Sequence, residues 1–399
     1  MDVTSRSRNR LDAAREGIAA HLDEFIALRH DIHQHPELAF NEHRTSRLIA
    51  SKLASWGYDV TTGVAGTGVV ATLVRGEGQR RLAIRADMDA LPIEEATGLP
   101  YASRNKGVMH ACGHDGHTTI LLTAARYLAE AGNFSGTLDL VFQPAEEIGA
   151  GARKMISEGL FEQFPADAVF GLHNWPGVTA GRFGFVAGPA MASVDKAVIK
   201  IVGKGGHGAE PHNAVDPIVA AASLITALQS IVSRNVDPRE MAVVTVGSIH
   251  GGEASNVIPG SVELQLTIRS YSEEVRRGLQ IRIPALARAQ AESFGAVAEV
   301  DYRLGFPSVI NPVEETAFAR KVAVDAFGDD ALDSAFAPRT ASEDFAFMLQ
   351  AKPGSYLFVG NGDSAPLHSA EYNFNDQIIA PAALYWVQLA EAFLNENRR

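Results

Sequence analysis

Apolar strand-like runs and helix-like segments follow one another along this chain in an order that few folds can accommodate. In the first half of the chain, short apolar runs are mostly separated by longer segments in which apolar residues recur at helical spacing. Strands that are apolar along their whole length, with helices between them, favour an α/β layer with a largely parallel sheet. The expected strands are residues 69–74, 81–86, 137–143 and 167–173.

Helical segments precede and separate these runs. Apolar residues recur at helical spacing in 11–30 and 41–56, ahead of the strands, and in 117–132, between them. Asp115, just before the last of these segments, is the expected N-cap. Beyond residue 305, helices are expected at 312–327, 343–350 and 376–396, with a strand at 355–360.

The pattern changes near residue 190. From there the chain follows the order β-α-β-β-α-β over about 110 residues, which is the ferredoxin-like pattern. The six segments are 195–203, 216–232, 242–249, 261–270, 272–292 and 296–304. We therefore predict a discontinuous α/β domain made of residues 1–190 and 305–399, interrupted by an inserted α+β domain at residues 191–304.

Composition and charge exclude several classes of function. A formal net charge of -12 at pH 7 argues against nucleic-acid and anionic-membrane partners, since both need a basic surface. The single cysteine cannot form an internal disulfide, and the first residues lack the apolar core of a signal peptide. No apolar run reaches about 18 residues, the length that a membrane-spanning helix needs. We expect a cytoplasmic protein that binds neither membranes nor nucleic acids.

Residues suited to metal binding or catalysis are concentrated at the ends of the predicted strands. The stretch "MHACGHDGHTT" (109–119) holds the only cysteine together with three histidines, and it lies directly before a helix. Open α/β sheets bind ligands at the carboxyl ends of their strands. The candidates are Asp87 and Asp89 after the strand 81–86, then His110, Cys112, His114 and His117, then Glu146 and Glu147 after the strand 137–143, and finally His173 and the distant His368.

Taken singly, each of these residues has a structural interpretation, because lone histidines at strand ends are usually hydrogen-bonded and buried cysteines usually pack as small apolar side chains. Taken together they leave two kinds of enzyme. In the first, Cys112 is a nucleophile whose pKa is lowered by the helix N-terminus, but this hypothesis does not account for the adjacent Glu146 and Glu147. In the second, a metal hydrolase, one carboxylate binds the cation while its neighbour takes a proton from water. A set of one cysteine, three histidines and one glutamate exceeds what one tetrahedral ion needs, so two metal ions are expected.

Five motifs of the sequence resemble those of a known family. The motifs "RADMDALP", "MHACGHDGHTT", "QPAEE", "GLHNWP" and "LHSAEYNF" occur in order, and they resemble the amidohydrolase branch of the M20 metallopeptidases, which includes hippurate hydrolases, N-acyl-amino-acid amidohydrolases and auxin-conjugate hydrolases. The resemblance covers about residues 25–390. It implies a zinc-peptidase-like α/β catalytic domain with an inserted ferredoxin-like α+β lid or dimerisation domain, which agrees with the order of segments.

The resemblance also implies roles for individual residues. Glu146 would be the general base, and Asp89 would orient a metal ligand without binding the metal itself. In the inserted domain, His207 and Asn256 match segments of the family that contact substrate, His207 acting on the developing oxyanion, and Arg269 is a candidate for binding the substrate carboxylate. The implied metal ligands are Cys112, His114, Glu147, His173 and His368. The wider clan has a histidine ligand where this chain has Asp87, so a contact between Asp87 and the metals remains open.

These observations predict a metal-dependent amidohydrolase that cleaves the amide bond of N-acyl amino acids, of hippurate or N-acetyl type. The alternative is a dipeptidase or aminopeptidase with the same dinuclear centre. A catalytically silent metal-binding scaffold is a further possibility, although a scaffold has no need of Glu146. Two divalent ions per subunit are expected, and Mn, Zn, Co and Ni all suit these ligands. The resemblance further implies a homodimer or higher homo-oligomer assembled through the inserted domain, with His207 acting in its own subunit or in its partner.

Overall fold

The computed structural model describes residues 3–396, and the chain divides into two compact units. The first unit runs to Gly188 and resumes with Ile310–Ala337 and with the chain from Asp344 onward. The second unit comprises Pro189–Val309 and Pro338–Glu343. The segment Pro338–Glu343 departs from the predicted division, which placed it in the discontinuous α/β domain. Its place follows from tertiary contacts: the Nη1 atom of Arg269 donates to the carbonyl of Thr340 at 3.1 Å and to Ser342 Oγ at 2.7 Å.

The first unit is built on a seven-stranded sheet in the order β1-β2-β4-β3-β5-β15-β6. The central strands β4, β3, β5 and β15 are parallel, as the apolar runs predict, whereas β1, β2 and β6 pair antiparallel at the two edges. The strands are β1 (Asp59–Val64), β2 (Gly68–Arg75), β3 (Arg81–Asp87), β4 (Gly136–Gln143), β5 (Ala168–Pro176), β6 (Phe183–Gly184) and β15 (Gly354–Gly362).

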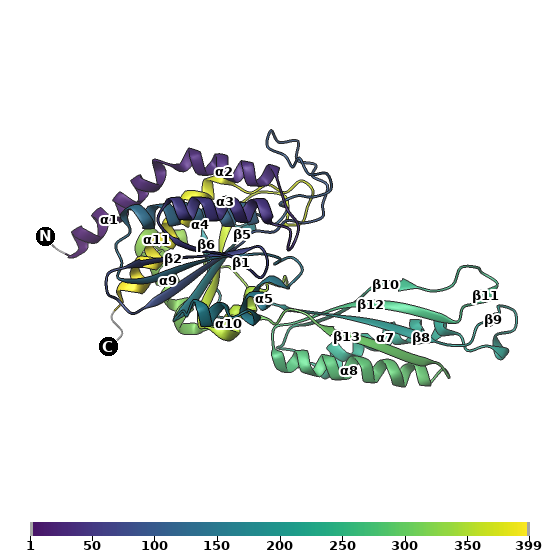
Figure 1. Cartoon of the computed structure of the whole chain (residues 1–399). Coiled ribbons are helices and arrows are strands. Elements are labelled where there is room, and N and C mark those ends of the chain that lie inside the picture. Colours follow the sequence, from purple (N-terminus) through teal and green to yellow (C-terminus); the bar gives the residue numbers. More distant parts are fainter. Residues whose placement is uncertain (1–2, 397–399) are drawn as a thin grey trace. The chain divides into compact units, whose positions relative to one another are not determined.

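Helices cover both faces of this sheet. Consecutive residues of β5 show the two faces, because Phe170 meets Phe393 of α11 with ring centroids 6.1 Å apart, whereas a side chain at Gly171 would meet Phe345 of α10. Helices α4 and α11 therefore lie on one face, and α5 and α10 on the other (Figure 1). The helices are α1 (Val3–Ala19), α2 (Leu22–Gln34), α3 (His43–Ser55), α4 (His114–Ala131), α5 (Gly151–Ser157), α6 (Leu160–Gln163), α9 (Val313–Phe327), α10 (Phe345–Ala351) and α11 (Ile379–Asn395).

Two local predictions in this unit are wrong. The single helix predicted at 11–30 is two helices, α1 and α2, and α2 begins with Asp23 and Glu24 in its first turn, where carboxylates complement the positive end of the helix dipole. Asp115 is not an N-cap, because α4 begins one residue earlier and its N-cap is Gly113, with a left-handed φ of 89°. The carboxylate of Asp115 is bonded instead to His33, which belongs to α2.

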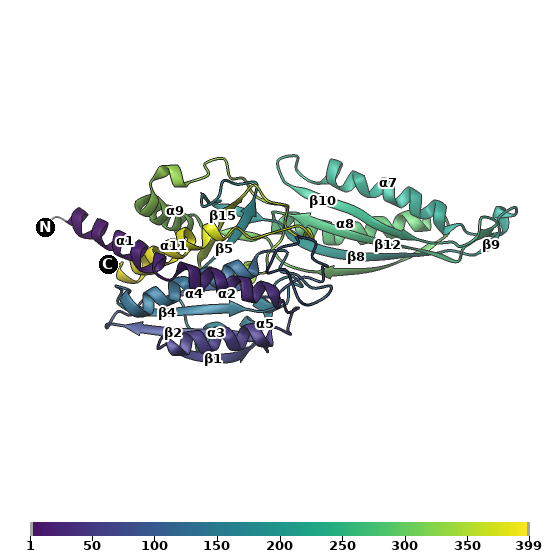
Figure 2. The same ribbon diagram turned by 90° about the horizontal axis from the view of Figure 1, so that it is seen from above.

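The second unit has the ferredoxin-like order. Its sheet runs β10-β12-β8-β13 with every pair antiparallel, and helices α7 and α8 pack together against it (Figure 2). The elements are β8 (Ser193–Val202), α7 (Pro217–Asn235), β10 (Ala242–His250), β12 (Ser261–Ser270), α8 (Glu273–Glu292) and β13 (Val297–Leu304). A two-stranded ribbon of β9 (Gly206–His207) and β11 (Val257–Ile258) extends from one end of the sheet (Figure 1). Strands β7 (Gly188–Met191) and β14 (Val309–Asn311) pair with each other at the two points where the chain passes from one unit to the other.

Two helices, α7 and the helical segment that ends with α11, are long and apolar enough to cross a membrane by length and composition alone. Each has a place in the core of its own unit. Trp386 and Leu389 of α11 are buried in the first core, and Leu224 and Leu228 of α7 are buried between the sheet and α8. Such burial is typical of a core helix and accounts for the apolar residues on the inner faces of both helices, whereas Ile218 and Val219 in the first turn of α7 are exposed.

Candidate metal centre

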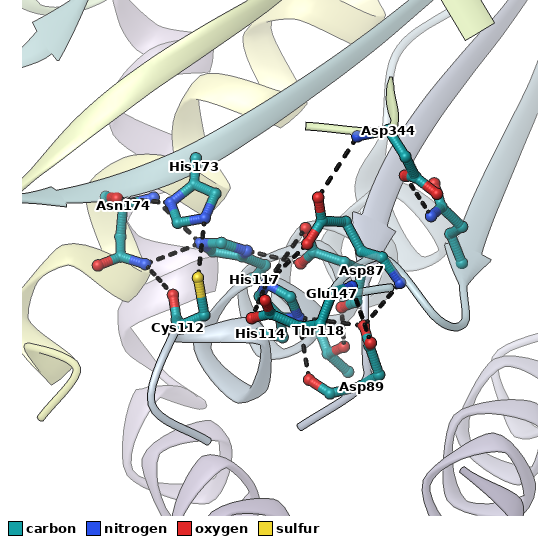
Figure 3. Close-up of polar contacts among 12 residues, drawn as sticks. Asp87, Asp89, Cys112, His114, His117, Thr118, Glu147, His173, Asn174 and Asp344 are labelled. Carbon is teal, nitrogen blue, oxygen red and sulfur yellow. Dashed lines mark hydrogen bonds and ion pairs between the residues drawn. The ribbon is translucent and has the colours of Figure 1, made fainter. Parts of the chain in front are cut away.

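The proposed metal ligands of the first unit meet at the carboxyl ends of its parallel strands, and Figure 3 shows Cys112, His114, Glu147 and His173 there. Cys112 and His114 lie at the start of α4, Glu147 follows β4, His173 lies near the end of β5, and His368 follows β15. Apart from Cys112 and His114, which are two residues apart, the ligands are distant from one another in sequence, and the parallel sheet brings the strand ends together at one edge.

The ligand atoms fall into overlapping groups. Sγ of Cys112 lies 3.4 Å from Nε2 of His173, and the two carboxylate oxygens of Glu147 lie 3.7 Å from His114 Nε2 and 3.4 Å from His368 Nε2. Within each of the triplets Cys112–His114–His173, Cys112–Glu147–His368 and His114–Glu146–Glu147, one donor atom per residue lies within 4.8 Å of the others. Because Cys112, His114 and Glu147 each belong to two groups, the geometry suits two neighbouring cations.

Two buried atoms test whether these residues fit a metal. Nε2 of His114 and Oε1 of Glu147 have no hydrogen-bond partner within the described part of the chain. A buried polar atom without a partner costs roughly 1–3 kcal/mol, and a divalent cation between the two would satisfy both. Thiolate, imidazole and carboxylate donors also match the preferences of zinc and related ions. The residues therefore fit divalent metal ions.

Hydrogen bonds behind the ligands fix their orientation. His173 Nδ1 lies 2.6 Å from the carbonyl of Asn174, and His114 Nδ1 lies 2.9 Å from the carbonyl of Asp89. With Nδ1–H donating to a carbonyl, each ring keeps Nε2 as an acceptor that can bind a cation. Burial and the neighbouring His117 lower the pKa of His173 well below its usual value, so this ring is neutral.

Asp89 orients the glutamate pair. Its two carboxylate oxygens accept the backbone N–H groups of Glu146 at 3.0 Å and Glu147 at 3.1 Å. The preceding residue, Ala145, adopts a left-handed backbone with φ of 54°, and its N–H donates to the buried Glu42 at 2.9 Å. A non-glycine residue in this conformation is held there by its surroundings, so the loop after β4 is fixed on both sides of the glutamates.

Asp87 and His117 are engaged with protein partners. The oxygens of Asp87 bond to Arg85 Nη1 at 2.6 Å and to His117 Nδ1 at 2.6 Å, and Nε2 of His117 accepts the backbone N–H of Asn174 at 3.0 Å. Burial opposes ionisation of Asp87, but the neighbouring His114 and Arg85 outweigh it and hold the pKa of Asp87 well below its usual range. Asp87 therefore acts on the site as a negative charge 3.8 Å from His114 Nε2.

The environment of Cys112 bears on the two enzyme hypotheses. Burial and the carboxylates of Glu147 and Glu146 raise the pKa of the Cys112 thiol well above its usual value. A cysteine nucleophile needs the opposite shift, so the protein alone does not activate this thiol. A bound cation would reverse the electrostatics and take the thiolate as a ligand.

Several residues with a place in this site were not singled out from the sequence. Asp344 donates its backbone N–H to Glu146 Oε1 at 3.4 Å, and Asn174 donates to the carbonyl of Cys112 at 2.8 Å while accepting the hydroxyl of Tyr372 at 2.6 Å. Arg85, with no exposed side-chain surface, offered one signal, since a charge inside an apolar strand needs a buried partner.

The predicted substrate contacts of the second unit fall into two groups. His207 pairs with Val257 across the β9–β11 ribbon, and the N–H of Gly208 donates to the carbonyl of Asn256 at 2.8 Å, so His207 and Asn256 are neighbours. Arg269 lies near the other end of β12, where it pairs with Val194. The eight-residue length of strand between Ser261 and Arg269 spans about 27 Å at roughly 3.4 Å per residue, so Arg269 is not brought together with His207 in one chain.

A thiol, three imidazoles and a carboxylate that converge at the strand ends beside Asp89 and Glu146 define a metallohydrolase type of centre. Comparison with known proteins agrees: the model of peptidase family M20/M25/M40 matches residues 83–392, and the chain belongs to this family. It is 44% identical over 371 residues to hippurate hydrolase of Campylobacter jejuni, covering 93% of this chain and 97% of the relative.

Two further relatives come from Bacillus subtilis. N-acetyl-L-cysteine deacetylase is 42% identical over 375 residues, covering 94% of this chain and 89% of the relative. The crystal structure of a dinuclear metal-binding peptidase of family M20 matches with a TM-score of 0.82 and 34% identity, covering 94% of this chain and 99% of that one. These relatives confirm the family, and with it the zinc-peptidase-like catalytic domain with an inserted lid domain.

Proposed function

We propose that this protein is a metal-dependent amidohydrolase that cleaves the amide bond of N-acyl amino acids. The observation that carries the proposal is that the candidate ligand groups overlap at Cys112 and Glu147, and that a further carboxylate, that of Glu146, lies directly beside them. The names of the relatives, a hippurate hydrolase and a deacetylase of N-acetyl-L-cysteine, support an amide between an acyl group and an amino acid.

The proposed metal ligands are Cys112, His114, Glu147, His173 and His368. When bound there, divalent cations supply Lewis acidity toward the substrate carbonyl and toward water. Glu146 accepts a proton from the attacking water and passes one to the amide nitrogen as the C–N bond breaks. Asp89 holds the backbone of Glu146 and Glu147, so that base and ligand keep a fixed spacing.

His207, Asn256 and Arg269 are the proposed substrate contacts. His207 donates to the oxyanion that develops on the carbonyl, Asn256 lies beside it, and Arg269 binds the carboxylate of the amino acid. A single N-acyl amino acid is much shorter than the stretch of β12 that separates Arg269 from the ribbon. We therefore propose a homodimer, formed through the second unit, in which one copy supplies His207 to the site of the other.

Turnover of a substrate panel tests the proposal. Purified protein is stripped of metal, reloaded separately with Mn, Zn, Co or Ni, and assayed with N-benzoyl and N-acetyl amino acids and with unmodified dipeptides. We expect hydrolysis of the N-acyl amino acids by reloaded protein and none by stripped protein. The comparison of turnover among the four ions shows which of them supports activity best. Turnover of dipeptides alone would favour the dipeptidase alternative, and no turnover with any ion would favour a scaffold. A cytoplasmic location stays a prediction, based on the single cysteine.

A further inference from the structure

A buried charge network lies behind the glutamate pair and connects β3, β4 and α10. Arg85, on β3, has no exposed side-chain surface, and its guanidinium donates from Nη1 to Asp87 Oδ2 at 2.6 Å and from Nε to Gln143 Oε1 at 2.8 Å. A third contact runs from Arg85 Nη2 to Asp344 Oδ1 at 3.3 Å. One guanidinium therefore joins the aspartate beside His114 to an aspartate from a distant part of the chain.

The carboxylate of Asp344 is held from three directions. Besides Arg85, Gln143 Nε2 donates to Oδ1 at 2.7 Å and the backbone N–H of Ala152 donates to Oδ2 at 2.9 Å. Asp344 occupies the N-cap position of α10, yet its side chain makes no capping hydrogen bond. Aspartate at that position normally accepts from the first turn of its own helix, so here the side chain serves the network instead.

The backbone of Asp344 faces the proposed base. Its N–H donates to Oε1 of Glu146 at 3.4 Å, and both residues are buried. The anchored side chain of Asp344 thus fixes the position of a donor that acts on the carboxylate of Glu146. A general base works only when its oxygen is held within reach of the proton it takes, and a misplacement of about 1 Å can cost about a hundredfold in rate.

We propose that Asp344 is a positioning residue for Glu146, anchored by Arg85 and Gln143, and that it sets the orientation of the carboxylate that accepts the proton. This inference rests on the proposed function, in which Glu146 is the base. It assigns to Asp344 no contact with substrate and no metal ligation.

A double-mutant cycle tests this role in the full-length, metal-loaded protein. In Asp344→Asn, an amide nitrogen replaces one oxygen where the surrounding groups are donors, so the anchor is disturbed. We expect kcat to fall about tenfold to a hundredfold, with KM and metal content little changed. In a Glu146→Gln background, Asp344→Asn should lower kcat by less than about threefold, because the carboxylate that Asp344 positions is already lost.

Asp139→Asn is the matched control, since Asp139 is a buried carboxylate on the same sheet that is bonded to Thr72 and Arg81. It is expected to lower stability without a selective loss of kcat. If Asp344→Asn does not fold, Gln143→Met replaces it in the double-mutant cycle, because this substitution removes the amide that donates to Asp344 Oδ1.

The outcomes separate the two proposals. A non-additive cycle with metal content retained supports the positioning role. This inference is overturned if the wild type is active and the decreases in kcat caused by Asp344→Asn and Glu146→Gln multiply in the double variant. It is also overturned if Asp344→Asn keeps full kcat. Either result leaves the proposed function intact. A wild type that hydrolyses no member of the N-acyl panel overturns the proposed function, and the role of Asp344 with it.

Discussion

His33 belongs to a buried ion cluster that makes the stability of the first unit depend on pH. Its Nδ1 atom lies 2.8 Å from Asp115 Oδ2 and its Nε2 atom 3.4 Å from Glu95 Oε1, while Arg29 Nη1 lies 3.4 Å from the same oxygen of Asp115. Burial by itself would lower the pKa of His33, but the charge and hydrogen bond of Asp115, with that of Glu95, raise it to about 9. The folded protein therefore holds His33 protonated at neutral pH.

The sign and size of the effect follow from this pKa. A histidine whose pKa is about 9 when folded and about 6.5 when unfolded contributes roughly 3 kcal/mol to stability in acid. Because the folded pKa is raised, the contribution is complete below about pH 6.5 and is lost as the pH rises through about 9. No exposed surface weakens the interaction, since the side chains of His33 and Asp115 are both fully buried.

The perturbation is His33→Gln, which keeps a polar side chain but cannot carry the charge. The free energy of unfolding is measured by urea titration from about pH 6 to about pH 10 for both proteins in the same buffers. We expect the difference between wild type and variant to shrink by roughly 3 kcal/mol across that range. The control is His250→Gln, the same substitution at an exposed position on β10. A wild-type-to-variant difference that stays constant for His33→Gln would refute the reasoning.

Three further predictions concern the site itself. Glu146→Gln should keep its metal and lose about a hundredfold or more of kcat, as measured by turnover and metal analysis; loss of metal would mean that Glu146 and Glu147 have exchanged roles. Cys112→Ser should bind metal more weakly, since an alcohol does not ionise near neutral pH as a coordinated thiol does; an acyl adduct on wild-type Cys112, found by mass spectrometry, would contradict this. His207→Ala should keep metal and fold but lose about a hundredfold of kcat, and mixing it with Glu146→Gln should restore part of the activity. Absence of recovery after demonstrated subunit exchange would count against delivery from a partner subunit.

Much of the fold could be predicted because its signals are local. Strands β3, β4 and β5 are apolar along most of their length, and the alternation and turn residues between 195 and 304 mark the ferredoxin-like order. The predictions that were wrong concern features that are determined by tertiary contacts and not by local sequence. Asp115 has the residue type of a helix cap, but His33 takes its carboxylate, and the segment 338–343 joins the second unit through contacts with Arg269.

The candidate site was predictable in its residue types and less so in its supporting contacts. Cysteine, histidines and glutamates at strand ends stand out in sequence, whereas the contact between Glu146 and Asp344 joins residues 198 positions apart. Nothing local to "ASEDFAF" distinguishes Asp344 from an ordinary cap. The assignment of individual ligands, and of His207 as an oxyanion donor, stays a prediction until the variants are measured.

The pairing of β5 with β15 has a consequence for how the chain assembles during synthesis. The strands are hydrogen-bonded neighbours, yet the whole second unit lies between them in sequence. The entropy lost on closing a loop grows with its length, but the folded second unit brings its own ends together, since the N–H of Val194 donates to the carbonyl of Phe306 at 3.1 Å. A second unit that folds first on the ribosome thus shortens the loop that β15 must close. His368 follows β15, so the proposed ligand set is completed only after residue 368 has been translated, and shorter nascent chains lack this proposed ligand.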